Sequence, residues 1–183
     1  MLDLNKYLNE LSNNIKNEKV LSDLKSIKNE IINELNDSKI IIFGNGGSAS
    51  IADHFAVDMT KNAGYKTLSL NNAPLITCLA NDFGYDQWVS KCIDYYASEN
   101  DIAIFISSSG KSENMINGCN NAKNKGLKTI TLTGFDQNNP LSTLGDYNLW
   151  VNSNSYNIVE NLHQIWLLSL VDLLIGKSEY PAN

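Results

Sequence analysis

The sequence of 183 residues contains no arginine, so all 14 basic side chains are lysines, against 20 aspartates and glutamates. The net charge of −6 and the lack of a basic block argue against direct binding of nucleic acid or of an anionic membrane surface. A phosphate site in this chain would have to use backbone N–H groups, hydroxyls and lysine rather than guanidinium forks.

Cysteine is also scarce, with only Cys78, Cys92 and Cys119. Their odd number argues against a disulfide scaffold, and the absence of C-x-x-C spacing argues against a thiolate zinc motif. We expect free thiols in a reducing compartment, and hence a cytoplasmic protein. The N-terminal segment is unlike a signal peptide, because it carries acidic as well as basic residues. The longest apolar stretch, 165–176, is shorter than the roughly 20 residues that span a bilayer.

Apolar periodicity predicts the fold class. Residues 1–37 show helical spacing in two stretches, and from residue 39 short apolar runs alternate with helix-length segments. Strands that are apolar throughout and alternate with helices favour a parallel sheet covered on both faces. The predicted strands are 39–43, 66–70, 101–106, 128–132 and 147–151, and the helix-length segments are 49–62, 87–98, 112–125 and 156–175.

We therefore predict an α/β fold, a doubly wound five-stranded parallel sheet flanked by helices and preceded by two N-terminal helices. One domain would span 1–183, with the helices in 1–37 and the α/β core in 38–183. The apolar stripes of the leading helices can cover the domain's own sheet or the helices of a neighbouring subunit. The sequence leaves both possibilities open.

Two similar loops follow the first and third predicted strands. The first, 44–48, reads GNGGS, and the second, 107–112, reads SSSGKS. Glycine permits close backbone approach, and a helix N-terminus offers free N–H groups and the positive end of a dipole. Serine and asparagine also favour helix N-caps, so one such loop alone would be read as capping. Two loops in equivalent positions favour an anion-binding site at the carboxyl edge of the sheet.

The first loop also matches a dinucleotide fingerprint, G-x-G-x-x-A, through Gly44, Gly46 and Ala49. That fingerprint requires an acidic residue about 20 positions further on, to bind the ribose hydroxyls. No aspartate or glutamate lies between Asp58 and Asp82. A dinucleotide site is therefore disfavoured.

The only two histidines each lie near a carboxylate in a predicted helix. His54 precedes Asp58 by four residues, and Glu160 precedes His163 by three, so each pair shares a helix face. Such groups can bind a divalent metal or transfer protons. Taken alone, the first pair is as well explained as a surface pair, and His163 is better explained as a structural histidine.

Three segments in this order resemble the SIS (sugar isomerase) domain family, which has a flavodoxin-like fold. They are GNGGSASIADHFAVDM (44–59), ITCLANDFGYD (76–86) and the serine loop with the helix and strand after it (104–134). Within the family they are similar to the phosphoheptose isomerase branch. The resemblance covers about residues 38–175.

The resemblance implies a substrate site on three loops. Asparagines, glycines and an aspartate would contact the sugar, and serines would bind its phosphate. The matching positions are Asn45, Gly46, Gly47, Ser48, Asn81, Asp82, Ser107, Ser108, Ser109 and Ser112.

The resemblance also implies a zinc site, from which this sequence departs. His54 matches a zinc ligand, and Asp58 stands where the family has a glutamate that is both ligand and catalytic base. Glu160 replaces a glutamine ligand, and Leu168 replaces a histidine that is ligand and acid/base. We expect His54, Asp58 and Glu160 to bind Zn²⁺, and Asp58 or Glu160 to act as the base.

The function implied is conversion of sedoheptulose 7-phosphate to D-glycero-D-manno-heptose 7-phosphate through an enediol, in a cytoplasmic homotetramer that supplies heptose for lipopolysaccharide or capsule. This chemistry needs a base, an acid/base for the oxygens, and stabilisation of developing negative charge. An alternative is a non-catalytic SIS protein that binds the replication initiator or another partner. Leu168 favours that alternative, since leucine can neither bind metal nor transfer a proton.

Overall fold

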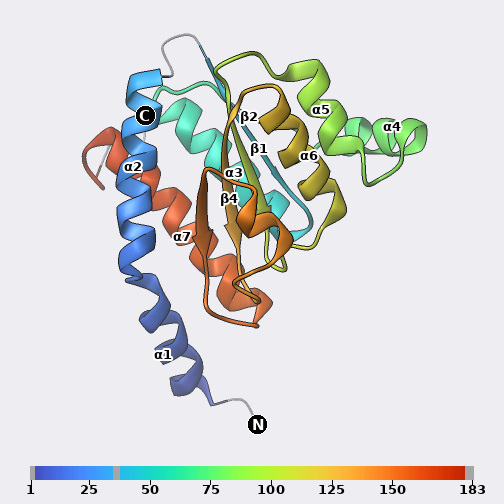
Figure 1. The fold of residues 1–183 in the computed structure, drawn as a ribbon. Coiled ribbons are helices and arrows are strands. Elements are labelled where there is room, and N and C mark those ends of the chain that lie inside the picture. The colour runs from blue at the N-terminus through green and yellow to red at the C-terminus, as the bar shows by residue number, and fades with distance from the viewer. Residues whose placement is uncertain (1–2, 35–37, 180–183) are drawn as a thin grey trace.

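Five parallel strands form the central sheet of the computed structural model, which describes residues 3–34 and 38–179 (Figure 1). The spatial order is β2-β1-β3-β4-β5, the flavodoxin-like order of doubly wound folds, and the predicted fold class is confirmed. The strands are β1 (Ile40–Gly44), β2 (Thr67–Ser69), β3 (Ile102–Ser107), β4 (Lys128–Thr133) and β5 (Tyr147–Trp150).

Strand register places the two glycine- and serine-rich loops side by side. β1 and β3 pair in parallel, with Gly44 opposite Ile106, so both strands end at the same edge of the sheet. β1 then leads into the loop at 44–48, and β3 leads into the loop at 107–112. This is the carboxyl edge, where open α/β sheets bind their ligands.

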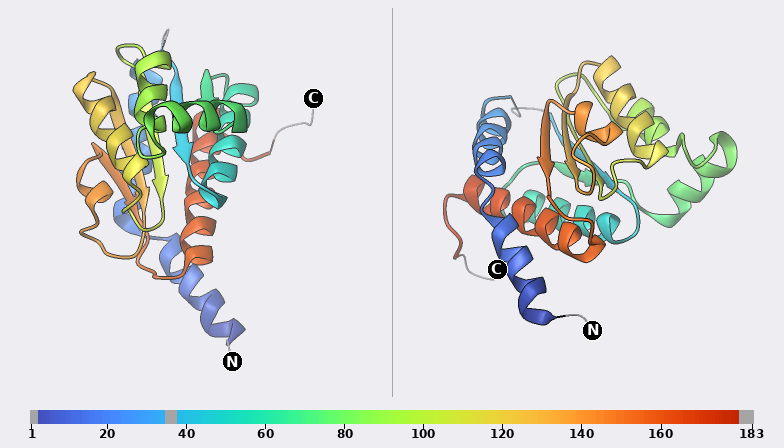
Figure 2. Two further views of the ribbon diagram at one scale, coloured as in Figure 1. Left: turned by 90° about the vertical axis from the view of Figure 1, so that its right-hand side faces the viewer. Right: turned by 60° about the horizontal axis from the view of Figure 1, so that its bottom comes forward.

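The two sheet faces receive alternate side chains of the strands. Ile40 and Ile42 point into one apolar cluster, and Ile41 and Phe43 point into the other. Helices that carry apolar stripes cover both clusters, as Figure 2 shows. α2 (Glu18–Glu34), α3 (Gly47–Lys61) and α7 (Tyr156–Ile175) cover the first cluster, whereas α4 (Ala73–Phe83), α5 (Trp88–Tyr96) and α6 (Glu113–Asn124) contribute to the second.

The first helix, α1 (Leu4–Ile15), projects away from the α/β core (Figures 1 and 2). Asp3 caps it by accepting a hydrogen bond from the backbone N–H of Asn5. Within the described part of the chain none of its residues is buried, although its spacing is amphipathic. Its C-terminal end is fixed by Trp166 of α7, whose Nε1 donates to the carbonyl of Ile15 over 3.3 Å.

α7 is the one described helix that is long and apolar enough to cross a membrane by composition. Of its apolar window, 44% is buried within the fold, because the helix packs between α3 and α2. Burial of this kind is typical of a core helix, and the buried residues include His163 and Trp166.

The sequence pattern predicted each strand to within two residues, and it predicted α7 at its observed bounds. α4 was not among the helix-length segments expected from the sequence. The helix begins with Asn72 as N-cap, whose side chain accepts from the backbone N–H of Leu75, and has proline in its first turn. A short 3₁₀ helix, η1 (Pro140–Thr143), lies between β4 and β5.

Candidate active site

The first loop joins β1 to α3 through three glycines. A Cβ on Gly44 would lie 2.4 Å from the carbonyl of Ser48, so only glycine permits this close turn. Gly46 is the N-cap of α3, with φ +55°, and it has no side chain to cap the helix. Ser48 is buried in the first turn. The loop therefore presents bare backbone at the positive end of α3.

The second loop presents hydroxyls at the start of α6. Ser112 is the N-cap, yet its Oγ lies 3.0 Å from Ser107 Oγ instead of capping the helix. Ser109 Oγ accepts from the backbone N–H of Lys111 over 3.2 Å. Ser108 is only 5% exposed, and its Oγ has no hydrogen-bond partner among the described residues. A buried hydroxyl without a partner is costly, so this one is available to a ligand.

An amide pair connects the two loops. Asn45 Nδ2 donates to Asn114 Oδ1 over 3.1 Å, and Asn114 Nδ2 donates back to Asn45 Oδ1 over 2.9 Å. Tyr85, before α5, donates its hydroxyl to the same Asn45 oxygen over 3.0 Å. These residues line a cavity of about 480 Å³, here called the serine-loop pocket: Asn45, Tyr85, Asp86, Ser112, Glu113 and Asn114.

Sequence reasoning missed Tyr85 and Asn114 in this pocket. Tyr85 lies inside the segment 76–86 that carried the family resemblance, but only Asn81 and Asp82 were selected from it. Those two residues are exposed on α4, where Asn81 Nδ2 donates to Asp82 Oδ1 over 2.9 Å. Among the described residues no hydrogen bond joins either of them to the two loops.

A second cavity of about 390 Å³, here called the α3–α7 pocket, lies on the other side of the first loop. Asn45 lines the serine-loop pocket and Gly47 lines this one, so the glycine loop lies between the two cavities. The residues that line it include Gly47, Ser50, His54, Glu160, Asn161 and Gln164.

Glu160 and His54 approach this pocket from facing helices. A Cβ on Gly47 would lie 2.5 Å from Glu160 Oε2, so the Glu160 carboxylate rests directly against the first loop. His54 Nε2 lies 3.3 Å from Asp58 Oδ2, and His54 Nδ1 lies 3.4 Å from Gln164 Nε2. The other Asp58 oxygen accepts from Asn62 Nδ2 over 3.1 Å.

Comparison with known proteins identifies the family. The model of the SIS domain matches residues 6–134, which is more than half of the chain. The chain belongs to the SIS domain family. It is 35% identical over 145 residues to a phosphoheptose isomerase of Helicobacter pylori (strain HPAG1), covering 76% of this chain and 75% of that protein. It is 38% identical over 134 residues to the Aliarcobacter butzleri (strain RM4018) phosphoheptose isomerase, covering 70% of each.

Solved structures agree with this assignment. The phosphoheptose isomerase from Neisseria gonorrhoeae superposes on this SIS domain with a TM-score of 0.76 at 28% identity, covering 87% of this chain and 86% of that one. A phosphoheptose isomerase from Francisella tularensis has a TM-score of 0.78 over 97% of this chain and all of its own. Its identity of 24% supports the fold alone.

The zinc ligands expected in this SIS domain do not form one group. His54 and Asp58 lie together, and Glu160 lines the same pocket as His54. Within residues 3–34 and 38–179, however, no three histidine, cysteine, aspartate or glutamate side chains are placed to hold a metal ion. Leu168 is half-buried and offers no donor. The residues as placed therefore do not fit a three-ligand zinc site.

The cysteines and the second histidine lie outside this site. Cys78, Cys92 and Cys119 are free thiols, and burial raises the pKa of Cys92 and of Cys119 to about 12. Those two side chains therefore remain protonated and unreactive. His163 is fully buried, with Nε2 3.1 Å from the carbonyl of Thr133, so it is a structural histidine.

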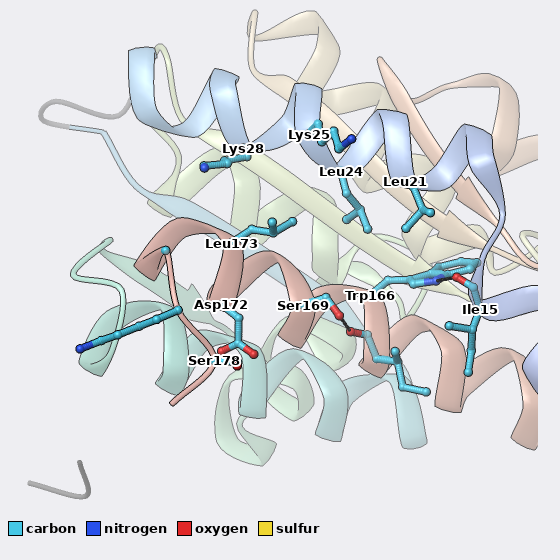
Figure 3. Close-up of a pocket in the computed structure, with 13 residues that line it drawn as sticks. Ile15, Leu21, Leu24, Lys25, Lys28, Trp166, Ser169, Asp172, Leu173 and Ser178 are labelled. Carbon is cyan, nitrogen blue, oxygen red and sulfur yellow. Dashed lines mark hydrogen bonds between the residues drawn. The ribbon is translucent and has the colours of Figure 1, made fainter. Parts of the chain in front are cut away.

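A third cavity of this SIS domain, here called the apolar groove, lies away from the loops, between α2 and the C-terminal half of α7 (Figure 3). Its volume is about 660 Å³. Leu21 and Leu24 line it from α2, and Trp166 and Leu173 line it from α7. Lys25, Lys28 and Asp172 also line it.

Proposed function

We propose that this SIS domain is an isomerase that interconverts sedoheptulose 7-phosphate and D-glycero-D-manno-heptose 7-phosphate through an enediol. Phosphoheptose isomerases are its relatives at 35% and 38% identity. The observation that carries the proposal is the pair of pockets on either side of a bare glycine loop. One offers the Ser112 hydroxyl at the start of α6, and the other offers the Glu160 carboxylate.

The serine-loop side suits the phosphate group. In the absence of arginine, a phosphate must be bound by hydroxyls, backbone N–H groups and a helix dipole. Ser108 supplies a buried hydroxyl with no described partner, and Ser107 and Ser112 supply a pair of hydroxyls in front of α6. The N-terminus of this 12-residue helix adds the favourable end of its dipole.

The remainder of the sugar would extend across Gly46 toward α7. No atom of the described residues lies within 4 Å of a Cβ built on Gly46, so the backbone there is open to a ligand. Beyond Gly46, the first charged group against the loop is the Glu160 carboxylate, next to Gly47. The reacting carbons would then lie beside Glu160.

Glu160 is a better candidate for the base than Asp58. Asp58 lies 11 residues after Gly47 on α3, which is about 16 Å along the helix axis. Its two oxygens are also engaged, one by His54 and one by Asn62. Glu160 lies against the loop itself, next to the open backbone across which the sugar would extend.

In the proposed reaction, Glu160 removes a proton from C1 of the ketose. The C–H electron pair forms the C1–C2 double bond, and the C2 carbonyl oxygen takes up a proton to give the enediol. Loss of the O1 proton and return of a proton to C2 then yield the aldose. A positioned base contributes about 10²- to 10⁴-fold to such a step.

The test is to incubate the purified protein with sedoheptulose 7-phosphate in D₂O and to follow the aldose phosphate by NMR. We expect turnover with deuterium at C2, and we expect Glu160→Gln to lower kcat about 10²-fold or more. Asp58→Asn should lower it much less. Absence of turnover at micromolar enzyme would reject the isomerase, and equal loss in both variants would reject Glu160 as the base.

The cellular role expected from the resemblance belongs to this proposal as well. The product would supply heptose for lipopolysaccharide or capsule in the cytoplasm. Deleting the gene should remove heptose from these surface glycans, and sugar analysis of the purified glycan would measure it. An unchanged heptose content would show that the enzyme does not supply heptose to these glycans.

A non-catalytic SIS protein is the second candidate, and Leu168 is the observation that favours it. Helix α7 carries Glu160, Gln164 and Leu168 at intervals of four residues. The first two line the pocket, and the next side chain in the row, Leu168, can neither accept nor donate a proton. Binding of purified replication initiator, measured by pull-down with the isomerase assay run in parallel, would separate the two candidates.

Self-association into a homotetramer is also part of the proposal, through α1 and the apolar groove. Leu4 and Leu8 of α1 are 63% and 49% exposed, and exposed Leu21 and Leu173 line the groove. We assign the groove to α1 of a second copy, because Leu4 and Leu8 stay exposed on this helix, whereas its other apolar residues pack partly against the core of its own chain. If two copies placed their α1 helices in each other's grooves, the exposed leucines of α1 and the apolar groove would both be covered.

Light scattering coupled to size-exclusion chromatography tests the assembly. Leu4→Ser with Leu8→Ser should shift the protein toward smaller species. Val57→Ser, on α3, is the matched control, because Val57 is similarly exposed but lies outside the groove. A monomeric wild type would contradict the assignment, as would an assembly that survives the double substitution.

A further inference from the structure

Both ring nitrogens of His54 have partners within the protein. Nε2 lies 3.3 Å from Asp58 Oδ2, and Nδ1 lies 3.4 Å from the amide nitrogen of Gln164. An ionised carboxylate only accepts hydrogen bonds, so Nε2 carries the proton and Nδ1 is the acceptor. The Gln164 amide nitrogen is a donor, which fits an acceptor at Nδ1.

Gln164 has a second N–H group that this contact leaves free. A glutamine amide carries two N–H donors, of which His54 takes one. Gln164 lines the α3–α7 pocket together with Glu160, which precedes it by four residues on the same face of α7. A base and a hydrogen-bond donor therefore lie side by side in one pocket.

We propose that Gln164 is a catalytic residue of the isomerase, donating its free N–H to the substrate oxygen that becomes negative while Glu160 removes the carbon-bound proton. This inference rests on the proposed function. As the C–H bond breaks, its electron pair forms the carbon–carbon double bond and the carbonyl electrons move onto oxygen. Glu160 gains the proton, and Gln164 keeps its own while hydrogen bonding the enediolate oxygen. Water then protonates that oxygen to give the enediol.

His54 and Asp58 act in this arrangement as positioning residues. The chain Asp58–His54–Gln164 runs from α3 to α7 and fixes the amide relative to Glu160. The negative charge of Asp58, 3.3 Å from Nε2, increases the acceptor strength of Nδ1 and so favours the amide contact. A donor held in place before the reaction stabilises developing charge more than a mobile one does.

The placement of these side chains does not fit a zinc ion that would stabilise the charge in this step. A metal held between His54 Nε2 and Asp58 Oδ2 would have only these two ligands from α3. The next residue of the α7 row is Leu168, which cannot contribute a ligand, and the described residues contain no three-ligand group. The amide of Gln164 thus takes the charge-stabilising role that the family resemblance gives to a metal.

The experiment combines kinetics with metal analysis of the purified wild type and of Gln164→Met, Gln164→Glu and Gln137→Met. Gln164→Met removes both donors at similar volume, and Gln164→Glu places a negative charge beside the developing one. Gln137→Met is the matched control, since it makes the same substitution at an exposed glutamine that lines neither of the two pockets. Circular dichroism and thermal unfolding check that each variant folds.

We expect Gln164→Met to lower kcat about 10²- to 10³-fold, which is the loss seen when an oxyanion donor is removed. KM should change by less than about threefold, because the phosphate is bound elsewhere. Gln164→Glu should be slower than Gln164→Met, an order that a merely structural role would not produce. Gln137→Met should keep wild-type kinetics. The wild type should contain substoichiometric zinc and keep its activity in EDTA.

Two results would overturn the inference while leaving the isomerase intact. One is wild-type turnover that Gln164→Met leaves unchanged. The other is stoichiometric zinc that His54→Ala removes, with activity lost in EDTA and restored by zinc. A wild type without turnover under either condition would instead reject the proposed function, and this inference with it.

Discussion

The Glu160 carboxylate occupies the space that a side chain at residue 47 would need, with Oε2 2.5 Å from the position of a Cβ on Gly47. The two residues are far apart in the sequence and meet because α3 and α7 pack side by side on one face of the sheet. The lack of a side chain at residue 47 therefore leaves the space that the Glu160 carboxylate occupies. It lets the proposed base rest on the loop that lies between the two pockets.

This relationship predicts that Gly47→Ala impairs catalysis more than folding. The added methyl group would displace the end of a flexible glutamate side chain, not backbone, so we expect little change in the free energy of unfolding. A small displacement of a catalytic group can lower the rate about 10²-fold. Measuring kcat and urea unfolding on the same preparation tests both expectations.

Ser50→Ala is the matched control for Gly47→Ala, because Ser50 lines the same pocket from α3 without touching Glu160 in any described contact. Its kcat should match the wild type. A Gly47→Ala variant with full activity would show that the position of Glu160 against the loop is unimportant.

Ser108→Ala should affect stability and substrate binding in opposite directions. The Ser108 hydroxyl is buried without a described partner, so replacing it with a methyl group should leave the free protein as stable as the wild type or about 1 kcal/mol more stable. Loss of a hydrogen bond to a charged phosphate should cost about 1.5–3 kcal/mol of binding. That corresponds to roughly a tenfold or greater rise in KM.

Thermal unfolding with and without sedoheptulose 7-phosphate measures the stability of the free variant and its gain on ligand binding, and steady-state kinetics measures KM. The variant should unfold at or above the wild-type temperature alone, and should gain less from the ligand. An unchanged KM would place the phosphate away from Ser108. A destabilised free variant would show that the hydroxyl already has a partner, such as a bound water.

The sequence predicted the fold well because its strands are continuous apolar runs with polar loops at their ends. Ile40, Ile41 and Ile42 are all buried, although they alternate between the two faces, and such runs are typical of doubly covered parallel strands. α4 was missed because its core-facing stripe is thin, with Leu79 as its one buried residue among those described. A helix on the rim of a domain needs few apolar positions.

The candidate site was only partly predictable. Loop residues follow from local sequence, so the sequence alone indicates Gly47 and Ser108 at the carboxyl edge of the sheet. Contacts across helices depend on how α3 and α7 pack, so neither the contact of Gln164 with His54 nor that of Asn45 with Asn114 follows from spacing along the chain. The expected metal ligands rested on the resemblance alone, and such a match does not fix where a substituted side chain points.

Asp101 should be a major contributor to stability at the amino edge of the sheet. Its carboxylate is only 1% exposed and accepts from the backbone N–H groups of Lys39 and Ser98 over 3.0 and 2.7 Å. It also pairs with Lys39 Nζ at 2.6 Å, which ties the start of β1 to the start of β3. Asp101→Ala would leave three donors without their acceptor, and we expect a loss of about 3–5 kcal/mol in urea unfolding.

The site lies at the opposite edge of the sheet, so Asp101→Ala should keep wild-type kcat at a temperature where it is folded. Asp101→Asn retains one carbonyl oxygen and should lose less stability. A loss below about 1 kcal/mol in the alanine variant would mean that water replaces the carboxylate at this edge.

His163 should make the fold sensitive to acid. Its Nε2–H donates to the carbonyl of Thr133, and its Nδ1 is buried without a partner among the described residues. A proton added at Nδ1 would find no acceptor, and burial lowers the pKa of His163 to about 4, against the opposing effect of the Thr133 hydrogen bond. The folded protein thus binds this proton more weakly than the unfolded chain, whose histidine titrates near 6.5.

Stability from the neutral imidazole is therefore complete above about pH 6.5 and is lost as the pH falls toward 4, by about 3 kcal/mol over that range. Chemical unfolding at several pH values should show a steeper loss in the wild type than in His163→Gln, which has no titrating group there. An equal slope in the two proteins would place the acid sensitivity in the carboxylates instead.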